Sequence, residues 1–178
     1  KGSWDDGTVP TCGHYLRWDL YKEAGYPEIT GYDDGSLLDA LEAMVALEPE
    51  TADGQKTYGM GAWFGAGQGW GEWVFTFGLA PQEGANLIET TGRVLAVSTV
   101  DSTPLENNQL TDPEGYFWRA VRFYNQANQR GLLDPDSFTM ASDLYEENLK
   151  AGKYMFNCPG WMSTSANPTA TRLFCRNL

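Results

Sequence analysis

The sequence has very little of the residue type from which most enzyme and metal sites are built. Among its 178 residues there is one histidine, His14. Catalytic triads and most zinc sites depend on histidine, often on more than one, so the sequence favours neither. His14 stands in a Gly-His-Tyr stretch, where a structural or exposed role is the more common one. We therefore expect no catalytic residue, no metal ligand and no cofactor.

Positive charge is also scarce. Twelve Lys and Arg residues stand against 24 Asp and Glu residues, which gives a formal net charge of -12. Binding to nucleic acid depends on clustered Lys and Arg, and an anionic membrane surface attracts basic segments. The composition therefore argues against both partners. The simplest consequence of the acidic excess is solubility.

Cysteine is rare and does not identify a compartment. Cys12, Cys158 and Cys175 form no CxxC motif and no zinc spacing. An odd number leaves at least one thiol unpaired within the chain, and a bridge between Cys158 and Cys175 is one alternative. The sequence contains no transmembrane run and no signal peptide, and it begins with Lys. We expect a processed protein or a piece of a longer polypeptide.

Aromatic residues, in contrast, are abundant at 13% of the chain. Trp18 lies between Arg17 and Asp19, so its ring is flanked by charged hydrogen-bonding groups. A sugar ring presents apolar C–H faces and polar hydroxyls, and it suits such a mixture, although a single aromatic ring is more often part of a core. Three further tryptophans stand in or beside glycine-bearing turns, where rings can stay accessible: Trp63, Trp70 and Trp161.

Helical spacing of apolar residues is clearest in the segment that follows residues 111–114. Thr111, Pro113 and Glu114 predict a capping box with proline in the first turn, where no N–H donor is needed. Gly131 is expected to end that helix. Its predicted apolar stripe consists of Phe117, Ala120, Val121, Tyr124 and Ala127. Four further helices are predicted. One covers about 18–24, one follows a cap at Asp33 or Asp34, one has its face at 70–77, and one is capped by Ser142 and ended by Gly152. The buried stripe predicted for the helix after Asp33-Asp34 consists of Leu37, Leu38, Leu41, Met44 and Val45.

Short apolar segments between these helices predict strands. The segment 87–89 and the segment 93–97 are expected to pair through a tight turn at Thr91-Gly92, whereas 102–109 is expected to be loop. The predicted strands are 15–16, 58–61, 87–89, 93–97 and 154–156. Alternating helices and strands indicate an α/β fold, in which helices pack around a small mixed sheet. No repeat, low-complexity segment or linker is evident, so residues 1–178 are predicted to form a single domain.

Acidic pairs in the chain do not form a calcium loop. Asp33-Asp34 and Asp134-Pro135-Asp136 lack the spaced oxygen ligands and closing glutamate of the twelve-residue motif. Helix capping and turn formation explain them better. The glycine-alternating stretch 65–71 lacks the third glycine of a dinucleotide-binding loop, and no Gly-Lys-Ser/Thr follows it, so it is not a phosphate loop. Its glycines are expected to allow close approach to a ligand or a tight turn.

Several segments together resemble the extracellular solute-binding proteins of ABC importers, the family that includes maltose-binding protein, and in particular the lipoprotein-type members of Gram-positive bacteria. Pro159-Gly160-Trp161 looks like the family motif in which a tryptophan faces the ligand cleft. The other matching segments are 15–28 (YLRWDLYKEAGYPE), 33–44 (DDGSLLDALEAM), 117–136 (FWR through GLLDPD) and 149–156 (LKAGKYMF).

The resemblance implies a fold of two α/β lobes that close around a ligand, with no catalysis. The chain is less than half the usual length and corresponds to the second, C-terminal lobe, with the first lobe absent. The implied function is capture of an oligosaccharide or another small solute for a membrane permease. The implied location is extracellular, as a membrane-anchored lipoprotein, or periplasmic.

The resemblance also suggests ligand-binding residues. Trp161 would stack on the sugar, and Trp70 matches a region where family members place another aromatic contact. Near the crossover into the lobe, Arg17, Trp18 and Asp19 are expected to border the cleft. Weaker candidates are Trp63 and Gln68.

Two alternatives belong to other functional classes. A carbohydrate-active enzyme, such as a glycosidase fragment, would use Glu72 and an Asp as its carboxylate pair, and the sequence contains no recognisable pair of this kind. A lectin-like module would bind sugar without a transporter.

Overall fold

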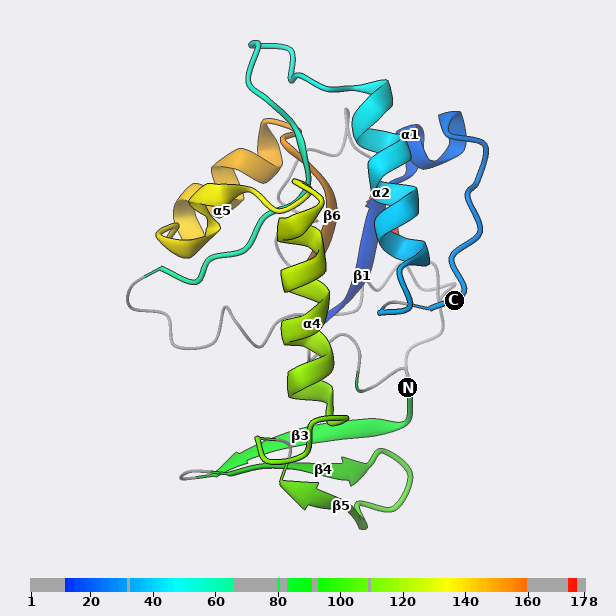
Figure 1. The fold of residues 1–178 in the computed structure, drawn as a ribbon, viewed down its shortest axis with the longest axis vertical. Coiled ribbons are helices and arrows are strands. Elements are labelled where there is room, and N and C mark those ends of the chain that lie inside the picture. Colours follow the sequence, from blue (N-terminus) through cyan, green and yellow to red (C-terminus); the bar gives the residue numbers. More distant parts are fainter. Residues whose placement is uncertain are drawn as a thin grey trace, which may run out of the picture.

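The structure is a computed structural model that describes residues 12–31, 33–65, 80, 83–90, 93–108, 110–159 and 173–175. Helices and strands are mixed, and the strands form two small sheets (Figure 1). This mixture of helices and small sheets is compatible with the α/β fold expected from the sequence. The first elements in chain order are β1 (Cys12–Arg17), α1 (Trp18–Glu23), α2 (Ser36–Leu47) and β2 (Tyr58–Met60). The remaining elements are β3 (Ala85–Thr90), β4 (Arg93–Ser98), β5 (Pro104–Asn108), α4 (Tyr116–Gln129), the 3-10 helix η3 (Pro135–Phe138), α5 (Ser142–Lys150), β6 (Tyr154–Pro159) and β7 (Leu173–Cys175).

The larger sheet has the strand order β2-β6-β1-β7. β2 and β6 run parallel, and β1 runs antiparallel to both β6 and β7. Leu16 is opposite Phe156, whereas Cys12 is opposite Pro159, so β1 ends close to where β6 begins. We call the end at which β2 and β6 begin the amino edge, and the end at which they finish the carboxyl edge.

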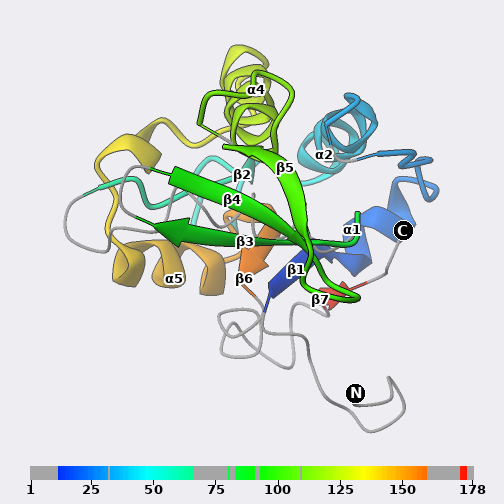
Figure 2. The same ribbon diagram turned by 90° about the horizontal axis from the view of Figure 1, so that it is seen from below.

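Helices α2 and α4 lie together over one side of this sheet (Figures 1 and 2). The apolar stripe predicted for α2 is confirmed, since four of its five residues are buried and Val45 packs partly against the core. In α4 the buried residues are Ala120, Phe123 and Ala127, and the Phe123 ring lies 6.4 Å from that of Phe156. Burial of such side chains supplies most of the stabilisation of a fold.

The predicted capping box is wrong. Helix α4 begins at Tyr116 with Gly115 in the N-cap position, several residues after Thr111. The Asp112 carboxylate accepts a hydrogen bond from the Glu114 N–H at 3.0 Å, which forms a local turn instead of a helix start. The predicted stripe is also wrong in part, because Val121 is exposed and Phe123, which it omitted, is buried. The predicted end is confirmed, because Gly131 adopts the left-handed conformation with φ of 69°.

The smaller sheet has the order β3-β4-β5 and is antiparallel throughout. β3 and β4 confirm the two predicted strands and extend them, while the turn residues 91–92 lie outside the described part. The loop predicted at 102–109 is wrong, because 104–108 forms β5, in which Leu105 pairs with Ala96. Its Pro, Asn and Glu content resembles loop, and only pairing with β4 makes it a strand. This sheet lies beyond the carboxyl edge, near the start of α4 (Figures 1 and 2).

The strand order separates Cys158 from Cys175. Cys158 belongs to β6 and Cys175 to β7, and β1 lies between these strands. Strands two positions apart are separated by about 10 Å, whereas the Cα atoms of a disulfide lie within about 7 Å. The structure therefore excludes the bridge between Cys158 and Cys175. No helix in the described part of the chain is long and apolar enough to span a membrane.

Candidate functional site

Three of the predicted binding residues are consecutive and lie at the amino edge. Arg17 is the last residue of β1, and Trp18 and Asp19 begin α1. Because β1 runs antiparallel to β6, this junction is at the opposite end of the sheet from Pro159, where β6 finishes. The structure thus brings Arg17, Trp18 and Asp19 together, but it places them away from the carboxyl edge.

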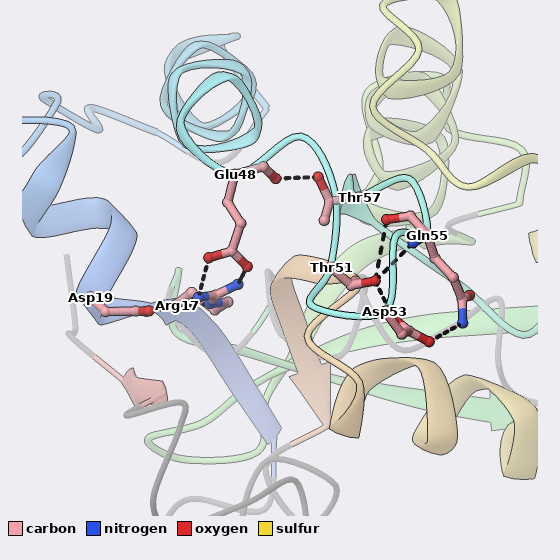
Figure 3. Close-up of polar contacts among 7 residues, drawn as sticks. All are labelled: Arg17, Asp19, Glu48, Thr51, Asp53, Gln55 and Thr57. Atoms are coloured by element: carbon pink, nitrogen blue, oxygen red, sulfur yellow. Dashed lines mark hydrogen bonds and ion pairs between the residues drawn. The ribbon is translucent and has the colours of Figure 1, made fainter.

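Arg17 is the centre of a polar cluster that joins α1 to the loop after α2 (Figure 3). Its Nη2 donates to Asp19 Oδ2 at 2.7 Å and to Glu48 Oε2 at 3.1 Å. Its Nε donates to Asp19 Oδ1 at 3.3 Å, and its Nη1 donates to Glu48 Oε1. The Arg17 side chain is only 7% exposed, against 43% for Asp19 and 36% for Glu48. A buried guanidinium held by two carboxylates is suited to fixing this junction.

The charges of the cluster are mutually stabilising. Burial acts to raise the pKa of the Asp19 carboxyl, but the hydrogen bonds and positive charge of Arg17 outweigh it and hold this pKa below its ordinary value. Burial likewise acts to lower the pKa of Arg17, and its bonds to Glu48 and Asp19 raise it overall. Each partner therefore favours the charged form of the other at neutral pH.

The loop between α2 and β2 is closed by its own side chains (Figure 3). The Thr51 hydroxyl bonds to the Asp53 carboxylate and accepts from the Gln55 N–H at 3.0 Å. Gln55 Nε2 donates to Asp53 Oδ2 at 2.7 Å, and the buried Thr57 hydroxyl donates to the Glu48 carbonyl. These bonds hold Glu48 in place for Arg17, so the loop is a support and its polar atoms are engaged with each other.

Trp18 belongs to a group of three rings on the surface of α1. Its ring centroid lies 5.6 Å from those of Tyr21 and of Tyr26, and the Tyr21 and Tyr26 rings meet edge to face at 5.7 Å. Tyr26 is about half exposed, whereas Trp18 is partly buried against the core. The Tyr21 hydroxyl donates to the Pro27 carbonyl at 2.8 Å. These contacts pack Trp18 against Tyr21 of the same helix and against Tyr26, three residues after its end.

The accessible ring expected for Trp63 is wrong. Trp63 is 2% exposed and packs against Tyr145 at a ring distance of 4.7 Å. The segment after β2 runs beside η3, where the Ala62 N–H donates to the Ser137 hydroxyl at 3.0 Å and the Phe64 N–H donates to the Ser137 carbonyl at 2.9 Å. These bonds hold the segment close to the core, so a neighbouring glycine does not leave the ring in solvent.

The other predicted binding residues lie outside the described part of the chain: Trp70, Gln68 and Trp161. The same holds for Glu72, the carboxylate of the enzyme alternative, and for the helix predicted at 70–77. Trp161 follows Pro159, the last residue of β6, by two positions in the sequence. The described part of the carboxyl edge is formed by the ends of β2 and β6, which are parallel neighbours.

Sequence reasoning missed an exposed aromatic group just beyond β2. Phe64 contacts Tyr124 edge to face at 5.2 Å and Phe138 at 5.8 Å, and Phe138 is largely exposed. Phe138 ends η3, two residues after Asp136, and its position in the sequence gave no sign of a surface ring. The group offers an apolar surface at Phe138, which suits packing better than chemistry.

A buried polar network was also missed, although its turn was predicted. Asp134 is 1% exposed, and its Oδ2 lies 2.8 Å from Lys153 Nζ and accepts from the Tyr154 hydroxyl at 2.8 Å. Asn148 Nδ2 donates to the same hydroxyl at 3.0 Å. Asp134 also caps η3 by accepting from the Asp136 N–H. Burial and the nearby Asp134 charge raise the pKa of Tyr154, which stays protonated.

The described residues contain no group of three His, Cys, Asp or Glu side chains that could hold a metal ion. The described residues form a polar cluster around Arg17 at the amino edge and an aromatic group around Phe64 beyond β2. A comparison with models of protein families and with curated proteins found no match for this chain.

Proposed function

We propose that this chain is the second lobe of an extracellular solute-binding protein of an ABC importer and that it binds an oligosaccharide. The proposal rests on the resemblance of the motifs and on one structural observation. β2 and β6 are parallel neighbours that finish at the same edge, and Pro159, the first residue of the Pro-Gly-Trp motif, is the last residue of β6. In open α/β sheets, ligands bind outside the carboxyl ends of the strands.

The proposed ligand contacts are therefore at the carboxyl edge. Trp161 is the stacking residue, Trp70 is a second aromatic contact and Gln68 is a weaker polar candidate. Arg17, Trp18 and Asp19 lie at the amino edge. There Arg17 binds Asp19 and Glu48, and Trp18 packs against Tyr21 and Tyr26. We assign them to the support of the fold, because a ligand at the carboxyl edge would not reach them.

The proposed action is capture without chemistry. A ligand that contacts two lobes only when they are closed shifts the population toward the closed form. The closed form would then deliver the sugar to a membrane permease, from a position outside the cell or in the periplasm. A single lobe offers part of the contacts, so it should bind sugar far more weakly than the complete protein.

The test measures tryptophan fluorescence of the full-length protein during titration with a panel of oligosaccharides. We expect Trp161→Ala to weaken binding of the responding sugar roughly five- to thirtyfold, since stacking on an aromatic ring is worth about 1–2 kcal/mol. Trp118→Ala is the matched control, because Trp118 is a partly exposed tryptophan on α4 whose Nε1 donates to the Leu110 carbonyl. Equal affinity in the parent and in Trp161→Ala would remove Trp161 from the site.

A second measurement separates capture from catalysis. The full-length protein is incubated with chromogenic glycosides, and we expect no turnover. Turnover that Glu72→Gln abolishes would overturn the proposal in favour of a glycosidase. Sugar binding without turnover supports the binding function.

A further inference from the structure

The smaller sheet is joined to the rest of the molecule by a distinctive ionic contact. Arg119 of α4 binds Glu83, which lies two residues before β3, and it also binds Asp33, in the loop before α2. Among the described side chains, Arg119 makes the only ion pair between residues 83–108 and the rest of the chain. Three segments that are far apart in sequence therefore meet at one guanidinium.

The geometry of this contact is close to ideal for arginine. Arg119 Nε and Nη2 donate to Asp33 Oδ2 and Oδ1 at 2.6 and 3.1 Å. Its Nη1 and Nη2 donate to Glu83 Oε2 and Oε1 at 2.8 and 2.6 Å. Bidentate hydrogen bonds of this kind are stronger and more directional than a single hydrogen bond. The Arg119 guanidinium also lies 5.4 Å from the centre of the Tyr116 ring, which limits its movement further.

The two halves of the contact differ in their exposure to water. The side chain of Asp33 is 24% exposed and that of Arg119 is 21% exposed, whereas that of Glu83 is 43% exposed. Hydrogen bonds from Arg119 hold the pKa of Asp33 below its ordinary value, so this carboxylate is charged at neutral pH. Water and salt weaken exposed ion pairs most. The bond to Asp33 is therefore the more protected half. The bond to Glu83, a carboxylate that Tyr116 also contacts, is the half that water and salt reach more easily.

We propose that Arg119 is an ionic latch that holds the three-stranded sheet β3-β4-β5 in place, and that the sheet is a flap that moves when the bond to Glu83 opens. The sheet lies beyond the carboxyl edge of the larger sheet (Figures 1 and 2). Its movement changes access to that edge. Without Arg119, the Asp33 and Glu83 carboxylates face the same point and repel each other. Loss of the latch therefore removes the attraction that holds the flap and adds a repulsion that moves it away. The inference does not depend on the ligand proposed above.

Hydrogen exchange measured by mass spectrometry tests the latch. In Arg119→Gln we expect amides of β3, β4 and β5 to exchange roughly fivefold faster at neutral pH. Loss of a bidentate surface ion pair should raise the equilibrium constant for opening by about that factor. Amides of β1 and β6 should be unchanged. Arg122→Gln is the matched control, since Arg122 lies one turn along the same helix and contacts Pro113 and Glu114 in the exposed turn before it.

Single carboxylate variants and salt sharpen the test. Glu83→Gln should speed exchange in the flap alone, whereas Asp33→Asn should also affect the start of α2. Concentrated NaCl should accelerate flap exchange in the parent but not in Arg119→Gln. Unchanged flap exchange in Arg119→Gln, an equal salt effect in both proteins, or faster exchange spread equally over β1 and β6 would each overturn the latch.

Discussion

Asp134 shows how one residue can have two structural roles, of which sequence reveals one. Its place before Pro135 predicts a turn, and its carboxylate does cap η3 by accepting from the Asp136 N–H. The same carboxylate is buried and balances Lys153, which comes from the turn between α5 and β6. A buried charge whose partner is removed is strongly destabilising, because neither water nor a counter-ion replaces the lost contact.

We predict that Asp134→Asn lowers the free energy of unfolding by about 3–5 kcal/mol, because it leaves the Lys153 ammonium buried beside a neutral amide. The measurement is equilibrium unfolding in urea. Asp136→Asn serves as the control, since Asp136 is an exposed carboxylate in the same turn, and it should cost less than about 0.5 kcal/mol. Equal losses for the two variants would mean that the buried ion pair adds nothing beyond the turn.

At the scale of elements, the junction between β1 and α1 is held by side chains rather than by a helix cap. Arg17 occupies the N-cap position of α1, and its side chain makes no capping hydrogen bond. Its guanidinium instead joins Asp19 of α1 to Glu48 after α2. The orientation of a short helix thus depends on charges from a segment about thirty positions away.

We predict that Asp19→Asn costs about 0.5–1 kcal/mol of stability near neutral pH, the range for a partly exposed ion pair. Because folding lowers the pKa of Asp19, its contribution is present above the unfolded value of about 3.9 and disappears as the pH falls through the folded value. Urea unfolding of variant and parent should therefore differ at about pH 7 and converge toward about pH 2. Glu23→Gln, an exposed change in the same helix, is the control. A difference that persists unchanged in acid would contradict the linkage.

At the scale of the whole molecule, the strand order decides which segments can meet. β1 enters the larger sheet between β6 and β7, so elements at opposite ends of the chain become neighbours. The same order places Arg17 at the amino edge and Pro159 at the carboxyl edge. Candidate residues that look equivalent in sequence are therefore divided between two edges of one sheet.

The strand order also makes a prediction for cysteine chemistry. Peptide mapping under non-reducing conditions should find no disulfide-linked peptide that contains both Cys158 and Cys175, because β1 separates their strands. As a control, peptide mapping after reduction and alkylation should detect both cysteine-containing peptides. A linked peptide recovered from the folded protein would show that the order β6-β1-β7 is incorrect.

Local patterns by themselves determined most elements and their ends. The stripe of α2, the stops at Gly131 and Gly152, and the strand after Gly152 follow from spacing and from residues that tolerate left-handed backbone. These features depend on interactions between near neighbours, which sequence records directly. The buried face of α4 was predicted only in part, because packing against the core buries Phe123 and leaves Val121 exposed.

Only the tertiary structure decided the features that depend on distant partners. β5 is a strand because β4 pairs with it, Trp63 is buried because its segment runs beside η3, and Arg119 is ion-paired because Asp33 and Glu83 converge on it. The division of Arg17 and Pro159 between two edges follows from the antiparallel direction of β1. Each of these contacts joins residues remote in sequence, and periodicity and composition contain no record of which remote segment becomes the neighbour.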